Sequence, residues 1–292
     1  MKSYTYKKLD AFTSGNSLGN PAAYIDLGND SISDNDMLEI AKEHKGFVSE
    51  FIFVTRIKNE IKLTYYSSEC EVSFCGHGTI ATMYELIKND KQLLGLSEFK
   101  FLTNKKGELT VYNRISSENA VFISAPEAIY FGSKIQIKEI AKNLGIDESI
   151  ITDQYPIDVI DAGLRTLIIP MKDLENEISI YPSQEELKAF CIANQIDIVL
   201  IFSKETLNDA CLAHTRVFAP KFGYLEDPAT GSGNSAFGYY LLKNKIWNGE
   251  MISIEQGGNK MIFNEVKLLV NNGNILFGGM ASKKIDGVYY LD

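Results

Sequence analysis

Two stretches of the sequence that resemble each other determine the fold we predict. Residues 71–86 read EVSFCGHGTIATMYEL, and residues 226–241 read EDPATGSGNSAFGYYL. They align without a gap at an offset of 155 positions (231 minus 76), and six of the sixteen positions are identical. Repeats of solenoid proteins are much shorter than this offset. The pair therefore predicts two similar half-molecules, each with a helix that begins at a Gly-x-Gly turn.

The length of the chain agrees with two halves. A chain of 292 residues is long for one small core, and two domains are the natural expectation. We place an N-terminal half at 1–122 and a C-terminal half at 123–292. The last ~12 residues are expected to pack back on the N-terminal half.

Composition and charge narrow the class of partner. The net charge of −9 makes nucleic acid or an anionic membrane an unexpected partner. No apolar run approaches the roughly 18 residues that a membrane helix needs, and charged residues interrupt the N-terminal stretch. The four cysteines (Cys70, Cys75, Cys191 and Cys211) show no CxxC spacing. We expect a cytoplasmic protein with reduced thiols.

Apolar patterns and turn residues predict many strands and few helices. Helices are expected at about 34–45, 78–88, 136–144 and 184–193 and after the second Gly-x-Gly turn, with strands between them and tight turns at 271–273 and at Asp286-Gly287. The two repeat helices are apolar on nearly every face, which is typical of buried helices. The predicted fold is α+β, with each half a barrel-like, mostly antiparallel sheet around a central helix.

A buried helix with a glycine-rich first turn can bind an anion. Its first N–H groups lack partners within the helix, and its dipole places partial positive charge there. Two such helix starts facing one cleft would hold a carboxylate and stabilise an enolate-like transition state. Alternatively, the glycines only allow close helix–sheet packing. A nicotinamide or flavin site is not expected, because the G-x-G-x-x-A match at Gly231–Ala236 follows a loop and not a strand.

Glu50 is a candidate general acid–base residue. In a strand it shares a face with Val48, Ile52 and Val54, and a carboxyl group among aliphatic side chains is desolvated, which raises its pKa. The alternative is a glutamate on an edge strand that points to water.

Four polar residues lie within or just before the Gly-x-Gly turns. Cys75 and Thr230 occupy equivalent positions before them, and a thiol at a helix start can have a depressed pKa, although a small buried cysteine can also simply fill space. His77 lies in the first helical turn and is expected to be neutral. Asp227 precedes the second helix, where Asp-Pro is also a common turn. The scattered histidines argue against a metal site.

Together these residues resemble the PhzF-like (phenazine biosynthesis-like) family, which is related to diaminopimelate epimerase. The matching segments are GNPAA at 19–23, SE at 49–50, FCGHGT at 74–79 for the family's FCGHAT, RVFAP at 216–220 with EDPATGS at 226–232, and QG at 256–257. Phe51 stands where threonine is usual, and Met261 replaces the family's arginine.

The resemblance implies a cofactor-free isomerase with two similar halves and the site between them. Glu50 would shuttle a proton on a small anionic metabolite, helped by His77 and Asp227. The backbone around the two turns would hold the substrate, and the residues assigned to substrate binding are Cys75, Gly76, Gly78, Thr79, Gly231, Ser232, Gly233 and Gln256. No metal is implied, and a homodimer is expected.

Two alternatives stay open. Racemases of this fold use two cysteines, one before each glycine-rich turn, but here the pair is Cys75 and Thr230. A threonine hydroxyl is too weak an acid–base group without an activating partner, so one-base chemistry fits better than an epimerase with two thiols. The second alternative is a protein that binds a small molecule without catalysis.

Overall fold

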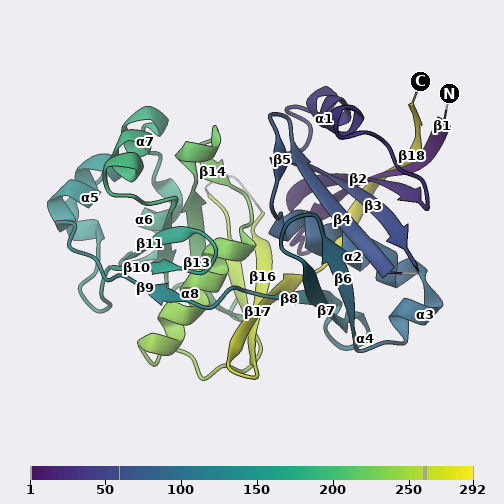
Figure 1. Ribbon diagram of the computed structural model, residues 1–292. Coiled ribbons are helices and arrows are strands. Elements are labelled where there is room, and N and C mark those ends of the chain that lie inside the picture. Colours follow the sequence, from purple (N-terminus) through teal and green to yellow (C-terminus); the bar gives the residue numbers. More distant parts are fainter. Residues whose placement is uncertain (1, 59, 259–261, 292) are drawn as a thin grey trace. The chain divides into compact units, whose positions relative to one another are not determined.

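The computed structural model describes residues 2–58, 60–258 and 262–291. The chain forms two compact units, one of Met1–Ser124 with Gly278–Asp292 and one of Ala125–Phe277. Both are mixed units with many strands and few helices (Figure 1), as expected of the α+β class. Within the described ranges, no helix is long and apolar enough to cross a membrane.

The first unit contains both ends of the described chain. Its strands are β1 (Lys2–Ala11), β2 (Asn20–Gly28), β3 (Glu50–Ile57), β4 (Glu60–Ser67), β5 (Glu71–Val72), β6 (Glu98–Thr103), β7 (Glu108–Arg114), β8 (Ala120–Ser124) and β18 (Ala281–Leu291). Its helices are α1 (Asp34–Glu43), α2 (Gly76–Asn89), α3 (Lys91–Leu94) and α4 (Ile115–Glu118). Strands β2 and β3 pair in parallel, as do β4 and β6, while β1–β2, β3–β4, β6–β7 and β7–β8 are antiparallel.

Strand β18 returns to pair with β1 along its whole length. The turn predicted at Asp286-Gly287 is wrong, because both residues lie inside β18, opposite Lys7 and Tyr6. A long ladder of backbone hydrogen bonds outweighs the local turn preference of an Asp-Gly pair. The ladder also places Asp286 within 3.9 Å of the Lys7 ammonium.

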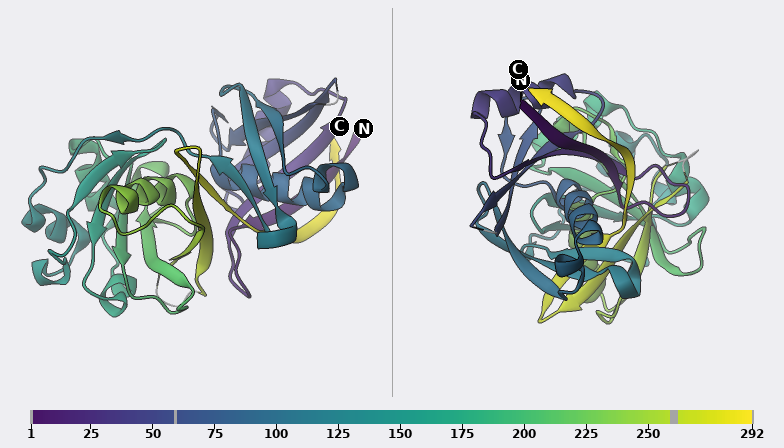
Figure 2. Two further views of the ribbon diagram at one scale, coloured as in Figure 1. Left: turned by 90° about the horizontal axis from the view of Figure 1, so that it is seen from below. Right: turned by 90° about the vertical axis from the view of Figure 1, so that its right-hand side faces the viewer.

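Helix α2 is the buried helix of the first unit. It packs against β1, β2, β3, β8 and β18, and it is the blue helix among the purple and yellow strands in Figure 2. Ile80, Met83 and Ile87 are fully buried. The one acidic side chain in its buried part, Glu85, accepts a hydrogen bond of 2.7 Å from Lys7, which offsets the cost of burying its charge. Burial on all sides agrees with the apolar sequence of this helix.

Strand β3 contributes its two faces to two different layers. Phe51 and Phe53 pack in the cluster beneath α1, whereas Ile52 points to the start of α2. Glu50 therefore lies on the α2 side, because alternate residues of a strand share a face. The expectation that Val48 shares this face is wrong: β3 begins at Glu50, and Val48 packs in the α1 cluster from the preceding turn.

The second unit has helices on both faces of its sheet. Its strands are β9 (Ile129–Tyr130), β10 (Asp158–Asp161), β11 (Arg165–Pro170), β12 (Ile198–Ser203), β13 (Cys211–Phe218), β14 (Glu226–Asp227), β15 (Ile252–Gln256), β16 (Asn264–Asn271) and most of β17 (Asn274–Gly279). The helices are α5 (Ile137–Leu144), α6 (Leu174–Ser179), α7 (Gln184–Ala193) and α8 (Gly231–Lys243), with 3-10 turns at Glu148–Ile150 and Pro220–Phe222.

The sequence of strand β12 explains why helices cover both faces of this sheet. All six of its residues are buried. Val199 and Ile201 join the apolar cluster with α5 and α7, while the ring of Phe202 lies 4.7 Å from that of Phe237 on α8. A strand covered on both faces reads as a continuous apolar run and not as an alternation. Helix α8 packs against β10, β11, β12 and β16.

A two-residue strand precedes each of the two repeat helices. Strand β5 pairs with β4 ahead of α2, and β14 pairs with β13 ahead of α8, both in antiparallel fashion. The loop predicted at 226–230 therefore begins as a strand at Glu226–Asp227. Each short strand anchors the chain immediately before it enters the helix.

Candidate active site at the start of helix α2

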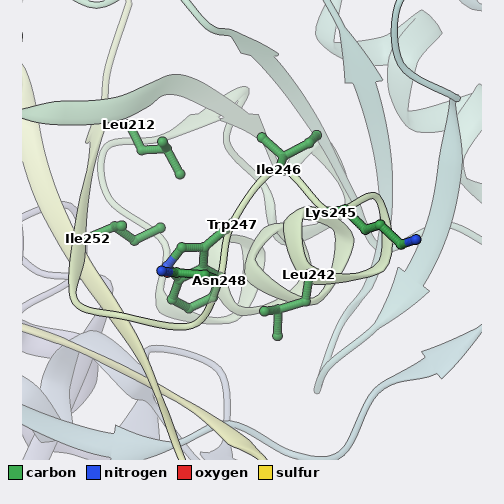
Figure 3. Close-up of a pocket in the computed structure, with 7 residues that line it drawn as sticks. All are labelled: Leu212, Leu242, Lys245, Ile246, Trp247, Asn248 and Ile252. Carbon is green, nitrogen blue, oxygen red and sulfur yellow. The ribbon is translucent and has the colours of Figure 1, made fainter.

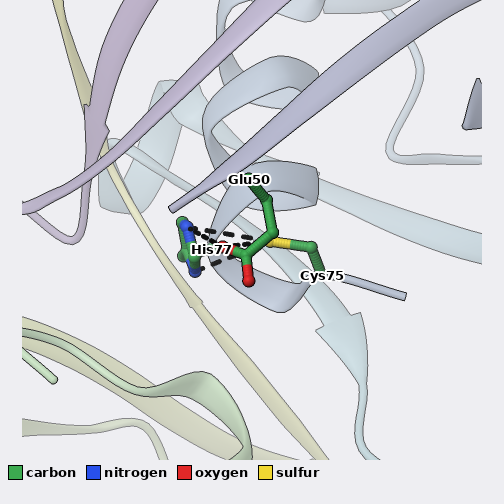
Figure 4. Close-up of side chains that lie close together, drawn as sticks. All are labelled: Glu50, Cys75 and His77. Carbon is green, nitrogen blue, oxygen red and sulfur yellow. Dashed lines mark hydrogen bonds and ion pairs between the residues drawn. The ribbon is translucent and has the colours of Figure 1, made fainter. Parts of the chain in front are cut away.

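Glu50, Cys75 and His77 converge in the first unit, although 25 residues separate the first two in sequence. Glu50 is the first residue of β3, Cys75 is the N-cap of α2, and His77 is in its first turn. Figure 4 shows the three side chains facing one another. Glu50 Oε2 lies 3.3 Å from His77 Nε2 and 3.8 Å from Cys75 Sγ. The side chains of Glu50 and His77 are 24% and 13% exposed, so the cluster lies just below the surface.

The first turn of α2 holds Cys75 in place. Its Sγ accepts a hydrogen bond from the Gly78 N–H at 3.2 Å, so this thiol is the side-chain cap of the helix. The Thr79 hydroxyl donates to the Cys75 carbonyl at 2.7 Å and lies 2.8 Å from the hydroxyl of Tyr65. Thr79 is fully buried. Its hydroxyl is engaged inside the first unit, so a direct bond to a substrate would require a rearrangement.

Gly78 sets how closely α2 approaches β3. A Cβ atom at this position would lie 2.7 Å from Cδ1 of Ile52 and 2.9 Å from Cys75 Sγ. The motif FCGHAT has alanine here. In this chain Ile52 fills the space that an alanine methyl would need.

The His77 ring is neutral at neutral pH. Burial lowers the pKa of His77 to about 4, and a hydrogen bond with Pro21 opposes that shift. Proline has no backbone N–H, so the ring donates and the Pro21 carbonyl accepts. A neutral ring that donates through one nitrogen keeps a lone pair on the other. The Nε2 atom of this ring lies 3.3 Å from Glu50 Oε2, within reach of a shared proton.

The second helix start is organised differently. The Thr230 hydroxyl donates to Asp227 Oδ2 at 2.5 Å and does not cap α8. The amide of Gln256 makes four hydrogen bonds: its oxygen accepts from the N–H of Thr230 and from Asn234, and its nitrogen donates to the Asp227 carbonyl and the Thr230 hydroxyl. Gln256 thus fastens the start of α8 to β15, and binding a substrate would break one of these bonds.

Close packing also explains glycines in this second turn. A Cβ at Gly231 would lie 2.3 Å from the ring of Phe277, and one at Gly233 would lie 3.3 Å from Ile198. Ser232, between them, is partly exposed. The packing role that we kept as an alternative is therefore present at both turns, and it does not prevent the N–H groups from binding a ligand.

Sequence reasoning missed the importance of Arg216. This side chain is fully buried and donates two hydrogen bonds to Glu226, at 2.9 and 2.8 Å. It also donates to the backbone carbonyls of Glu177, Ile178 and Ile180. A buried cation needs such compensation. Because Glu226 precedes Asp227, Arg216 fixes the strand that carries this predicted acid; the arginine in the RVFAP segment was the available signal.

The predicted site residues thus form two groups. Glu50, Cys75, Gly76, His77, Gly78 and Thr79 lie in the first unit, and Asp227, Gly231, Ser232, Gly233 and Gln256 lie in the second. Met261, where the family has arginine, lies outside the described residues. A pocket of about 540 Å³ at the end of α8 (Figure 3) contains neither group. It is lined by Leu212, Leu242, Lys245, Ile246, Trp247, Asn248 and Ile252, none of which carries a carboxyl group.

The contact between Gly78 and Ile52 yields a first prediction. Gly78→Ala should lower the free energy of unfolding by about 1–3 kcal/mol, because the added methyl overpacks the contact with Ile52. Ile52→Val alone should cost about 0.5–1.5 kcal/mol. The Ile52→Val change removes the Cδ1 atom that the new methyl would meet. The double variant, Gly78→Ala with Ile52→Val, should therefore lose less stability than the sum of the two single losses. Urea unfolding measures all four proteins, and a Gly78→Ala variant as stable as the wild type would refute the close contact.

A second prediction concerns pH. The pKa of His77 is near 6.5 in the unfolded chain and about 4 in the folded one, so the folded state resists protonation. Its stability should fall as the pH drops from 6.5 through 4, by up to about 3 kcal/mol. In His77→Gln this part of the pH dependence should be missing. Proton NMR of the ring, assigned with that variant, measures the pKa directly; a value near 6.5 would contradict the burial argument.

The sequence and the fold of this chain are similar to those of one family of known proteins. The family model described as "Phenazine biosynthesis-like protein" (PhzC-PhzF) matches residues 9–275. An uncharacterized isomerase of Bacillus subtilis is 29% identical over 265 residues, which cover 88% of this chain and 87% of that protein. A crystal structure of a PhzF-family phenazine biosynthesis protein from Bacillus anthracis is similar with a TM-score of 0.86, at 23% identity and with 100% of each chain covered.

More distant structures share the fold. A probable proline racemase from Agrobacterium radiobacter is similar with a TM-score of 0.60 at 11% identity, covering 99% of this chain and 93% of that one. At such identity the similarity concerns the fold alone. The match of the family model over nearly the whole chain, and the motifs that build the two helix starts, agree: this chain belongs to the PhzC-PhzF family of phenazine biosynthesis-like proteins.

Proposed function

We propose that the protein is an isomerase that moves a proton on a small carboxylate-bearing metabolite, with Glu50 as its single general acid–base group and no cofactor. The observation that carries the proposal is the contact of 3.3 Å between Glu50 and His77 at the start of a buried helix. The relative from Bacillus subtilis is described as an uncharacterized isomerase, which supports the reaction class.

The proposed reaction needs one base and one anion site. The Glu50 carboxylate takes a proton from carbon, which leaves an enolate, and then returns that proton to another carbon of the same substrate. No electron is gained or lost. The neutral His77 ring shares the proton with Glu50 while the enolate exists. Backbone N–H groups at Gly76 and His77, at the positive end of the α2 dipole, would stabilise the negative charge on oxygen.

We extend the proposal to the second helix start. Asp227 would assist the proton transfer, and Gly231, Ser232 and Gly233 would bind the same substrate. The support is the alignment of the two motifs at one offset and the anion-binding chemistry that the two starts share. That both helix starts contact one ligand, in a cleft between the halves, stays a prediction.

We infer that the two units are versions of one barrel-like architecture around a central helix. The strand pairings support this inference. In the first unit β2 and β3 are parallel, β3 and β4 antiparallel, and β4 and β6 parallel across α2. In the second unit β11 and β12 are parallel, β12 and β13 antiparallel, and β13 and β15 parallel across α8. The same order of pairings follows the same order of elements.

An amino-acid racemase is the first alternative. Thr230 stands where such an enzyme would need its second thiol, and its hydroxyl donates to Asp227. The carboxylate gives the hydroxyl an acceptor, but the hydroxyl remains a far weaker acid–base group than a thiol. We therefore expect Thr230→Cys not to create an efficient racemase. The second alternative is a small-molecule binding protein that keeps the cleft without catalysis.

The proposal also includes a homodimeric, cytoplasmic protein with a small anionic metabolite as ligand. The net charge of −9 disfavours nucleic acid and anionic membranes as partners.

The decisive prediction compares two variants. Candidate carboxylates are incubated with the protein in D2O, and exchange of carbon-bound hydrogen is followed by mass spectrometry. Glu50→Gln should slow exchange by about 10²–10⁴-fold, the usual contribution of a general acid–base group, while its urea unfolding stays close to that of the wild type. Cys75→Ser should slow exchange by less than about tenfold, since the thiol acts as a helix cap and polar neighbour.

The opposite ranking would replace this mechanism with thiol chemistry. Alkylation would then inactivate the protein in step with modification of Cys75. A wild type that binds carboxylates but exchanges no hydrogen would favour the binding protein.

A further inference from the structure

The three side chains at the start of α2 also form the ligand set of a transition-metal ion. We propose that Glu50 Oε2, Cys75 Sγ and His77 Nε2 bind Zn²⁺ as three of its four ligands, and that a bound ion blocks the site. These ligand atoms lie within 4.8 Å of one another. Thiolate, imidazole and carboxylate are the protein ligands that zinc prefers. In the sequence the scattered histidines argued against a metal site, but the fold brings one histidine to a cysteine and a glutamate.

The spacing of the three atoms matches a tetrahedral ion. Typical zinc–ligand bonds are about 2.3 Å to sulfur and about 2.0–2.1 Å to nitrogen or oxygen. At tetrahedral angles these bonds place nitrogen and oxygen ~3.3 Å apart, and sulfur ~3.6 Å from either. The structure has 3.3 Å between His77 Nε2 and Glu50 Oε2, 3.7 Å between Cys75 Sγ and His77 Nε2, and 3.8 Å between Cys75 Sγ and Glu50 Oε2. The three separations therefore agree to within a few tenths of an ångström with those around one tetrahedral ion placed above the plane of the three atoms.

One local movement is required. Cys75 Sγ lies 3.6 Å from Nδ1 and 3.7 Å from Nε2 of His77, so it faces the ring and not the lone pair of one nitrogen. Aiming Nε2 at the common point takes a rotation of the ring about its Cβ–Cγ bond, a soft torsion. The Glu50 and Cys75 side chains can stay where they are.

The surroundings of the three ligands resemble those of metal sites. The Gly78 N–H donates to Cys75 Sγ and so fixes the position of the sulfur beside the other two ligand atoms. The His77 ring donates to the Pro21 carbonyl, as metal-bound histidines commonly do through their second nitrogen. Binding releases the thiol proton to solvent, and the thiolate with the Glu50 carboxylate then balances the two charges of the ion.

Such a site would leave one coordination position for water or for a ligand carboxylate, as in zinc sites with three protein ligands. The ion would be coordinated by Oε2 of Glu50, the oxygen that faces His77, and this oxygen could then not accept a proton. Zinc and proton transfer by Glu50 therefore exclude each other. This last consequence rests on the proposed function, whereas binding of the metal does not.

Titration with Co²⁺ tests the site without any substrate. The full-length wild type should bind one Co²⁺ per chain, with a thiolate-to-cobalt charge-transfer absorption and the intense visible bands of a tetrahedral ion, and Zn²⁺ should displace it. Cys75→Ser should lose the charge-transfer absorption. Each of Cys75→Ser, Glu50→Gln and His77→Gln should bind Zn²⁺ at least roughly 100-fold more weakly, because each lacks a direct ligand.

Cys70→Ser is the matched control. It removes the exposed thiol of the chain and should leave both the absorption and the affinity unchanged. The proposal fails if the wild type binds no stoichiometric Co²⁺. It also fails if the charge-transfer absorption persists in Cys75→Ser or disappears in Cys70→Ser. If Zn²⁺ binds as expected but leaves hydrogen exchange unaffected, the metal site stands and the role of Glu50 as the base falls.

Discussion

The close contact between Gly78 of α2 and Ile52 of β3 sets the spacing on which the candidate site depends. Without a Cβ at Gly78, the first turn of the helix lies directly on the strand. Glu50 shares the face of Ile52 and is the first residue of β3, so its carboxyl group reaches Cys75 and His77. A shift of one residue in the register of β3 would turn Glu50 to the α1 side. The same packing contact that closes the core therefore also determines where the Glu50 carboxyl group lies.

The two repeat motifs each place a short strand before a buried helix, but the polar groups around the two helix starts differ. In the first unit, a thiol caps the helix and lies beside a carboxyl group and a neutral imidazole. In the second, Thr230 turns to Asp227, and Gln256 takes over the fastening of the helix start. The equivalent positions Cys75 and Thr230 therefore do not have equivalent roles. This asymmetry favours one-base chemistry over a symmetric pair of thiols.

Much of this arrangement was predictable from local sequence patterns. The repeat located both buried helices, and the alternation in β3 placed Glu50 on a face separate from Phe51 and Phe53. Three features were not predictable in this way. Val48 lies outside β3 because the strand begins at Glu50, and Asp286-Gly287 continues β18 because of its pairing with a strand more than 270 residues earlier. The four hydrogen bonds of Gln256 join residues 22 to 29 positions apart. The last two depend on contacts between distant parts of the chain, which local propensity does not encode. Val48 instead belongs to the turn after α1, where its N–H donates to the His44 carbonyl.

The central claim is that the start of α2 holds a carboxylate next to Glu50 and His77. A crystal of the wild-type protein soaked with a mixture of small unsaturated or hydroxylated carboxylates tests it most directly. We predict density for a carboxylate on the N–H groups of Gly76 and His77, with a carbon of the ligand within reach of the Glu50 carboxyl group. Density only at other places, with this helix start occupied by protein atoms or water, would contradict the account.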